Sequence, residues 1–242
     1  MTRLPADSTS GPVAPEVLDE QLAYYRARAP EYDRWFRREG RYDRGPEVTI
    51  AWQRELDEVR GQLAQLDLDG RDVLELAAGT GLWTEALLNC GAAVTAVDAA
   101  PEMLAQLERR IPAGRLSTIR ADLFTWVPAR QFDAVVSCFF MSHVPDELFD
   151  GFVALVVAAV RPGGRVFLLD SRPETLSTAA DHTLPTGGAQ TMLRRLDDGR
   201  TFTIVKRFRT DTELTEAFAA HAIAVSVRDT ATFFQTVVGT RG

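Results

Sequence analysis

The chain has 242 residues, of which 45% are hydrophobic and 25% charged, and this composition is typical of one large globular domain. Its formal net charge of −7 disfavours nucleic acid as a partner, because neutralising phosphates requires clustered lysine and arginine. Two cysteines give neither a disulfide framework nor zinc-ligand spacing, so we predict no metal site.

The amino-terminal stretch contains no apolar signal-peptide core, and no apolar run in the chain approaches the roughly 18 residues that a membrane span needs. We therefore expect a cytoplasmic protein without a membrane partner. Residues 1–15 are rich in proline, serine, threonine and glycine and predict a disordered leader. Residues 16–46 predict helical segments broken at Pro30, and a long helix with one apolar stripe is expected from about Glu47.

The middle of the chain, residues 71–170, alternates between predicted strands and predicted helices. Strands that alternate with helices imply βαβ units and a parallel sheet with right-handed crossovers. The strands are almost continuously apolar, as expected where helices cover both faces of the sheet. The expected strands are 72–77, 92–99, 115–122, 132–140 and 165–170, and the expected helices are 81–91, 101–111 and 145–160.

The last third has a different pattern. Residues 171–190 resemble a loop, and residues 191–208 predict a β-hairpin that turns at Asp198 and Gly199. A short helix at 211–221 and a closing strand pair at 222–229 and 233–239 follow. The whole predicts an α/β fold with a Rossmann-like, doubly wound, mostly parallel seven-stranded sheet whose last strand is antiparallel, plus N-terminal helices and an inserted β-hairpin.

A turn of small residues, Leu76 to Gly81, follows the first strand of this sheet. Ligands of such sheets bind beyond the carboxyl ends of the strands. A dinucleotide requires Gly-x-Gly-x-x-Gly, but Thr84 stands in place of the third glycine, and the Glu75 carboxylate repels a pyrophosphate. S-Adenosylmethionine carries no phosphate but has a sulfonium, an ammonium and a ribose diol, so a nearby carboxylate favours it.

Four signals stand in chain order, each at the end of a predicted strand: the turn after Glu75, then Asp98, Asp122 and Cys138. Together they resemble the motifs of the class I S-adenosylmethionine-dependent methyltransferases of the small-molecule branch. The resemblance covers residues 71–170, and Ala77 replaces the first glycine of the family's first motif. It implies S-adenosylmethionine as cofactor and S-adenosylhomocysteine as product. It also implies a set of cofactor-binding residues: Glu75, Ala77, Gly79, Gly81, Asp98, Met103, Asp122, Leu123 and Cys138.

The resemblance also implies how these residues act. Asp98 would accept both ribose hydroxyls, Met103 would pack on the adenine, and Cys138 would line the methionine end. Asp122 would accept from the adenine amino group, while the Leu123 amide would donate to the ring. A carboxylate suits a vicinal diol because it offers two acceptor oxygens.

The N-terminal helices at 16–46 and the segment 171–210 are expected to shape the acceptor pocket of a single domain spanning 16–242. The aromatic residues of the first segment suit a lid over the cofactor, contacted by Tyr24 and Tyr32, and an apolar or aromatic acceptor. Simple packing of these helices on the sheet edge is the alternative. The length and negative charge favour a small-molecule acceptor, and the chain is expected to be a monomer or homodimer.

His143 follows the fourth strand and is the expected general base, because imidazole titrates near neutral pH. A purely structural role of its ring is the alternative, and His182 and Asp170 are further candidates for the base. The acceptor atom, whether O, N, S or C, stays open. Two other functions stay open as well: a non-catalytic cofactor-binding protein on the same fold and a dinucleotide-dependent oxidoreductase.

Overall fold

The computed structural model describes residues 11–112 and 114–242. Seven strands form the central sheet, in the spatial order β3 (Leu116–Arg120), β2 (Ala93–Asp98), β1 (Asp72–Leu76), β4 (Phe132–Cys138), β5 (Val160–Ser171), β9 (Phe234–Arg241) and β8 (Ile223–Asp229). The strands from β3 to β5 pair in parallel, whereas β9 runs antiparallel to both β5 and β8. This confirms the predicted fold class, including the antiparallel last strand.

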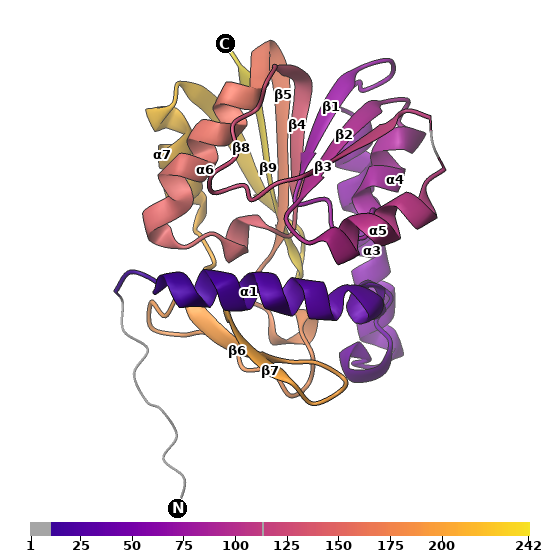
Figure 1. Cartoon of the computed structure of the whole chain (residues 1–242), viewed down its shortest axis with the longest axis vertical. Helices are drawn as coiled ribbons and strands as arrows, with labels where there is room; N and C mark the ends of the chain where they lie inside the picture. The colour runs from indigo at the N-terminus through magenta and orange to yellow at the C-terminus, as the bar shows by residue number, and fades with distance from the viewer. Residues whose placement is uncertain (1–10, 113) are drawn as a thin grey trace, which may run out of the picture.

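Helices cover both faces of the sheet (Figure 1). One face carries α3 (Pro46–Ala64), α4 (Leu82–Asn89) and α5 (Pro101–Arg110), and the other carries α6 (Asp146–Ala159) and α7 (Asp211–Ala220). Neighbouring residues of one strand serve the two layers, because Val73 joins the first apolar core and Leu74 the second. The continuous apolar strands of the sequence follow from this double cover. Among the described residues, no helix has both the length and the apolar character needed to cross a membrane.

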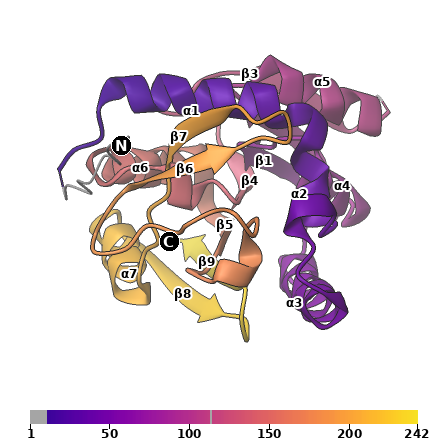
Figure 2. The same ribbon diagram turned by 90° about the horizontal axis from the view of Figure 1, so that it is seen from below.

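The N-terminal helix α1 (Pro15–Arg28) lies across the carboxyl ends of the parallel strands, beside a hairpin made of β6 (Thr191–Arg195) and β7 (Thr201–Val205) (Figures 1 and 2). Two side chains of α1 accept hydrogen bonds from amides of the exposed edge of β7. The Thr203 amide donates to Glu20 over 2.7 Å, and the Val205 amide donates to Gln21 over 2.9 Å. The helix therefore satisfies backbone donors that an open strand edge leaves unpaired.

The predicted break at Pro30 lies in a 3-10 turn, η1 (Ala29–Glu31), which separates α1 from the short helix α2 (Tyr32–Phe36). Three further 3-10 turns are η2 (Gly40–Tyr42), η3 (Met141–His143) and η4 (Thr175–Ser177). The predicted leader at 1–15 lies mostly outside the described residues. Its last part, Gly11 to Ala14, makes specific contacts with the body of the molecule that are described below.

Candidate active site

A cavity of about 350 Å³ opens beyond the carboxyl ends of β1, β2 and β4, with α1 on its far side. Its volume lies in the usual range of small-molecule sites. The cavity brings together eight of the residues that the sequence singled out: Tyr32, Ala77, Gly79, Asp98, Met103, Asp122, Leu123 and Cys138. Helix α1 adds apolar and aromatic side chains, among them Leu18, Leu22 and Tyr25.

The small-residue turn after β1 has an unusual backbone. Ala77, Gly79 and Gly81 all adopt the left-handed conformation, with φ of 55°, 58° and 87°. A side chain at Gly81 is excluded by packing as well, since a Cβ there would lie 2.9 Å from Leu107 Cγ. Ala77 carries a Cβ in a conformation that disfavours one, so the turn holds backbone strain next to the cavity.

Asp98 ends β2 and joins this turn to the start of α5. One of its carboxylate oxygens accepts from the Gly79 amide and the other from the Ala100 amide, each over 2.8 Å. Burial raises the pKa of Asp98 to about 6, and the backbone hydrogen bonds oppose that rise. The carboxylate is therefore fixed in orientation at the edge of the cavity.

Glu75 lies deeper than Asp98 and does not line the main cavity. It is 1% exposed, accepts a hydrogen bond from Thr84 Oγ1 over 2.5 Å, and borders a small space beside Ala77 and Cys138. Burial, with a smaller contribution from the nearby Asp98 carboxylate, raises the pKa of Glu75 to about 8, and the hydrogen bond from Thr84 opposes that rise. Gly81 also stands outside the cavity lining, where its role is to allow the turn.

The structure differs from expectation at Tyr24, which was a predicted cofactor contact. Tyr24 is fully buried and packs with Met192, Leu196 and Ile204 of the hairpin region. Its neighbour Tyr25 lines the cavity instead. Successive residues point about 100° apart around a helix, so only the docking of α1 decides which tyrosine faces the cavity.

A second, smaller pocket of about 30 Å³ adjoins the first, and Tyr25, Tyr32 and Phe139 line both. Its other walls are mostly polar or charged: Arg28, His143, Ser171, Ser177, Thr178, Arg194 and Lys206, with Trp35 and Leu184. Phe139 has a left-handed φ of 60°, a second strained residue at this edge of the sheet. The sequence analysis did not single out the three cations of this pocket, Arg28, Arg194 and Lys206. The one available signal was that Lys206 is the only lysine in the chain.

His143 faces this smaller pocket. Its Nδ1 lies 2.7 Å from the Val205 carbonyl oxygen, which can only accept, so Nδ1 carries the proton and Nε2 keeps a lone pair. Burial, followed by the charges of Lys206 and Arg194, holds the pKa of His143 well below its usual range. The ring is therefore neutral at physiological pH and is a weak base.

The two further base candidates have structural partners. Burial lowers the pKa of His182 to about 3, and its Nδ1 lies 2.8 Å from an Arg194 guanidinium nitrogen. Asp170 accepts from the Ser142 amide and hydroxyl, each over 2.7 Å, and pairs with Lys206 at 3.4 Å. Both groups thus organise the walls of the pocket.

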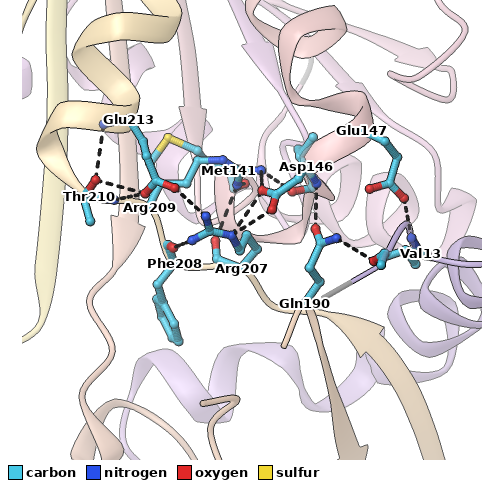
Figure 3. Close-up of polar contacts among 12 residues, drawn as sticks. Val13, Met141, Asp146, Glu147, Gln190, Arg207, Phe208, Arg209, Thr210 and Glu213 are labelled. Carbon is cyan, nitrogen blue, oxygen red and sulfur yellow. Dashed lines mark hydrogen bonds and ion pairs between the residues drawn. The ribbon is translucent and has the colours of Figure 1, made fainter. Parts of the chain in front are cut away.

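A polar cluster at the start of α6 holds the segment before α1 (Figure 3). The Gln190 side chain accepts a hydrogen bond from the Asp146 amide over 2.7 Å and donates one to the Gly11 carbonyl over 3.1 Å. The Val13 amide donates to the Glu147 carboxylate over 2.5 Å. Arg207 pairs with the Asp146 carboxylate at 3.1 Å in the same cluster. These contacts fix where α1 begins and hence how it covers the cavity.

Three comparisons with known proteins bear on this site. A family model described as "Methyltransferase domain" matches residues 73–164. Enzymes named ubiquinone biosynthesis O-methyltransferase, from Xanthomonas campestris pv. campestris (strain B100) and Xylella fastidiosa (strain 9a5c), are 34% and 35% identical over 142 and 141 residues. Each match covers 56% of this chain and 56% or 54% of the relative, so the chain spans about half the length of these curated relatives.

Two solved structures match almost the whole chain. They are named "DhpI-SAH complex structure" and "DhpI-SAM-HEP complex", share 33% and 34% sequence identity, and superpose with TM-scores of 0.74 and 0.75. Both matches cover 95% of this chain, and they cover 99% and 100% of the other chains. An S-adenosylmethionine-dependent methyltransferase from Mesorhizobium loti, at 20% identity, 77% of this chain and a TM-score of 0.59, shares the fold.

Proposed function

The chain belongs to the S-adenosylmethionine-dependent methyltransferases, and we propose that it transfers a methyl group from S-adenosylmethionine to a small-molecule acceptor. The observation that carries this proposal is the cavity at the carboxyl ends of β1, β2 and β4, where an acidic side chain ends β2 beside a left-handed turn. The bound cofactor supplies an electrophilic methyl group on a sulfonium.

We propose that the main cavity holds the cofactor. Asp98 is oriented to accept from the ribose hydroxyls, and Met103 offers an apolar surface to the adenine. Asp122 and Leu123 would contact the adenine edge and Cys138 the methionine end, and the support is that all three line the cavity. The close approach of backbone at Gly79 leaves room for the body of the cofactor, since no atom lies within 4 Å of a Cβ there.

Glu75 would act from behind the turn. Its carboxylate borders the space beside Ala77 and Cys138, so it is suited to hold the cofactor ammonium, directly or through water. A cation at this point favours the ionised carboxylate against its burial, because opposite charges stabilise one another in a low-dielectric site. The hydrogen bond from Thr84 keeps the carboxylate in place.

In the reaction, the chain mainly positions the cofactor and the acceptor relative to one another and excludes water from them. Tyr25, Tyr32 and Phe139 line both pockets, so the smaller pocket adjoins the cofactor cavity. Positioning of this kind supplies roughly 7–11 kcal/mol of a barrier. A base role for His143 stays a prediction, and its depressed pKa, together with the hydrogen bond from Nδ1 to the Val205 carbonyl, favours a structural role of the neutral ring instead.

We also propose that residues 16–46 close over the cofactor as a lid. The support is that Leu22, Tyr25 and Tyr32 line the cavity and that Asp33 accepts from Thr80 of the turn over 2.7 Å. Lids of this kind gate access and exclude water. Hydrogen exchange of this segment should slow when S-adenosylhomocysteine binds, and equal exchange in both states would contradict a lid.

A binding and transfer experiment tests the proposed function. Calorimetry on the full chain should show binding of S-adenosylhomocysteine and none of NADH. The loaded enzyme should then pass a labelled methyl group to at least one member of a panel of phenols, thiols, amines and oxyanions. Binding without transfer across the panel would favour the non-catalytic alternative, and failure to bind S-adenosylhomocysteine would overturn both. The cytoplasmic location, the monomer or homodimer and the absence of nucleic acid as partner stay predictions.

A further inference from the structure

The smaller pocket is lined by three buried cations from separate parts of the chain. Arg28 ends α1, Arg194 lies on β6 and Lys206 follows β7, and their exposed fractions are only 6%, 7% and 4%. All three line the same space of about 30 Å³. Burying a charge is costly unless a partner of opposite charge or a set of hydrogen bonds compensates it.

Their compensation within the chain is incomplete. Lys206 donates to the Ser142 hydroxyl over 2.6 Å and pairs with Asp170 at 3.4 Å, so one carboxylate serves one cation. Neither guanidinium has an ion pair among residues 11–112 and 114–242, although the Glu31 carboxylate acts on Arg28 from farther away. The Nε atoms of Arg28 and Arg194 are buried and lack a hydrogen-bond partner in the same described residues.

The contacts that do exist show how the guanidinium groups are held. Arg28 lies against the rings of Tyr24, Tyr32, Trp35 and Tyr42 and donates to the Tyr42 hydroxyl over 3.4 Å. Arg194 lies 2.8 Å from the Nδ1 of His182. Aromatic faces and neutral groups orient these cations without neutralising them. The pocket thus keeps a net positive charge with donors left over.

The three cations also act electrostatically on the same side chain, His143. Burial is the main cause of the low pKa of His143, and Lys206, Arg194 and Arg28 each lower it further. The pocket has room for a compact group of a few atoms, since one water needs about 10–15 Å³ of such space. It has no room for an aromatic ring, so an apolar or aromatic part of the acceptor, as the sequence predicts, would lie outside this pocket.

We propose that this pocket, built from Arg28, Arg194 and Lys206, binds a compact oxyanion group of the methyl acceptor, such as a carboxylate or a phosphonate. The inference rests on the proposed methyl transfer, because Tyr25, Tyr32 and Phe139 place the pocket against the cofactor cavity. Guanidinium groups suit such ligands because their paired donors match two oxygens of a carboxylate or phosphonate.

Calorimetry on the full chain saturated with S-adenosylhomocysteine tests the proposal, with propionate, ethylphosphonate and ethanesulfonate as probes and propionamide as the neutral comparison. At least one anion should bind saturably at one site, whereas propionamide should not bind. If S-adenosylhomocysteine binds and no anion does, the pocket proposal fails while the methyltransferase assignment stands. If S-adenosylhomocysteine does not bind, the proposed function itself fails.

Variants identify the site. Arg194→Met should weaken the binding of the anion at least ~10-fold while changing the affinity for S-adenosylhomocysteine less than about two-fold, because a charge-assisted contact is lost. Arg194→Lys should recover part of the loss. Arg195→Met is the matched control, since Arg195 is the next residue of β6 and its side chain is exposed. Equal anion affinity in Arg194→Met and Arg195→Met would overturn the assignment.

The single lysine supplies a readout that needs no variant. A chain labelled with ¹³C at lysine Cε gives one side-chain signal, from Lys206. Burial lowers the pKa of Lys206 to about 8, so this signal should titrate near pH 8 in the free protein. A bound anion favours the charged ammonium and should move the midpoint upward. An unchanged midpoint at anion saturation would contradict binding beside Lys206.

Discussion

The two adjoining pockets contain ionisable groups of opposite charge. The cofactor cavity of about 350 Å³ borders carboxylates whose pKa values burial raises, Asp98 in its wall and Glu75 behind the turn. The smaller pocket of about 30 Å³ holds cations, and burial lowers the pKa values of Lys206 and His143. In both places, burial disfavours the charged form of these ionisable groups.

The charged groups of the two pockets also come from different parts of the chain. The carboxylates Asp98 and Glu75 come from strands of the sheet, whereas the cations of the smaller pocket come from the end of α1, from β6 and from the residue after β7. A cofactor with an ammonium and a sulfonium is matched to the first, and an anionic acceptor to the second. Methyl transfer between them would thus bring opposite charges together at the boundary formed by Tyr25, Tyr32 and Phe139.

The largest expected effect comes from the titration of Glu75, behind the cofactor cavity. Burial raises its pKa to about 8 in the folded chain, so the stability that its protonation provides is complete below about pH 4.5 and is lost as pH rises through 8. Glu75→Gln keeps an acceptor for Thr84 and removes the titration. Without ligand, this variant should be more stable than the parent at pH 9, by roughly 5 kcal/mol for a pKa raised from 4.5 to about 8 at about 1.4 kcal/mol per unit, and similar at pH 5.

Urea unfolding of both proteins at pH 5, 7 and 9 measures this difference. Asp98 titrates in both proteins, so the comparison of parent with variant isolates Glu75. A difference that stays constant from pH 5 to pH 9 would show that Glu75 is ionised throughout and that burial does not control the cofactor side.

A second test removes the carboxylate that faces the main cavity. Asp98→Ala loses a charge-assisted contact of about 1.5–3 kcal/mol and should raise the dissociation constant for S-adenosylhomocysteine at least ~10-fold. Asp57→Ala is the control, because Asp57 is exposed on α3 and pairs with Arg60 across one helical turn. Calorimetry decides, and unchanged affinity in a folded Asp98→Ala protein would remove the ribose role.

A third test replaces His143 to learn whether methyl transfer needs a proton acceptor beside the smaller pocket. Because its pKa is depressed and an oxyanion arrives without a proton to lose, His143→Gln should keep turnover within about ten-fold of the parent at neutral pH. A loss of roughly 10²-fold or more that recovers at high pH would instead establish the general base. His221→Gln is the control, since His221 pairs with Asp150 at 2.8 Å, away from both pockets.

The smallest expected effect concerns the strained turn. Ala77 has a φ of 55°, and an L-residue in this conformation costs roughly 1–2 kcal/mol, of which glycine's extra flexibility in the unfolded chain cancels part. Ala77→Gly should therefore stabilise the protein by about 0.5–1 kcal/mol. Gly79→Ala, with a φ of 58°, is the reverse change and should destabilise it by a similar amount. Thermal unfolding checks both, and a lower midpoint for Ala77→Gly would contradict strain at this turn.

The sequence by itself determined the sheet and the cofactor side of the site. Apolar runs, glycine turns and Pro101 at a helix start are local signals, so the strand and helix order from 72 to 170 followed from neighbouring residues. Parallel strands bring their carboxyl ends to one edge, which is why Ala77, Asp98 and Cys138 could be placed together without coordinates.

Only the tertiary structure decided which face of α1 covers that edge and which charges meet beneath it. Tyr25 rather than Tyr24 lines the cavity, because the docking of α1 on β7 sets the rotation of the helix. Arg28, Arg194 and Lys206 converge from α1 and the two sides of the hairpin, and no periodicity relates residues so far apart in the chain. Their charge appears as a surface property in the sequence, and becomes a buried site only through long-range packing that removes the water around it.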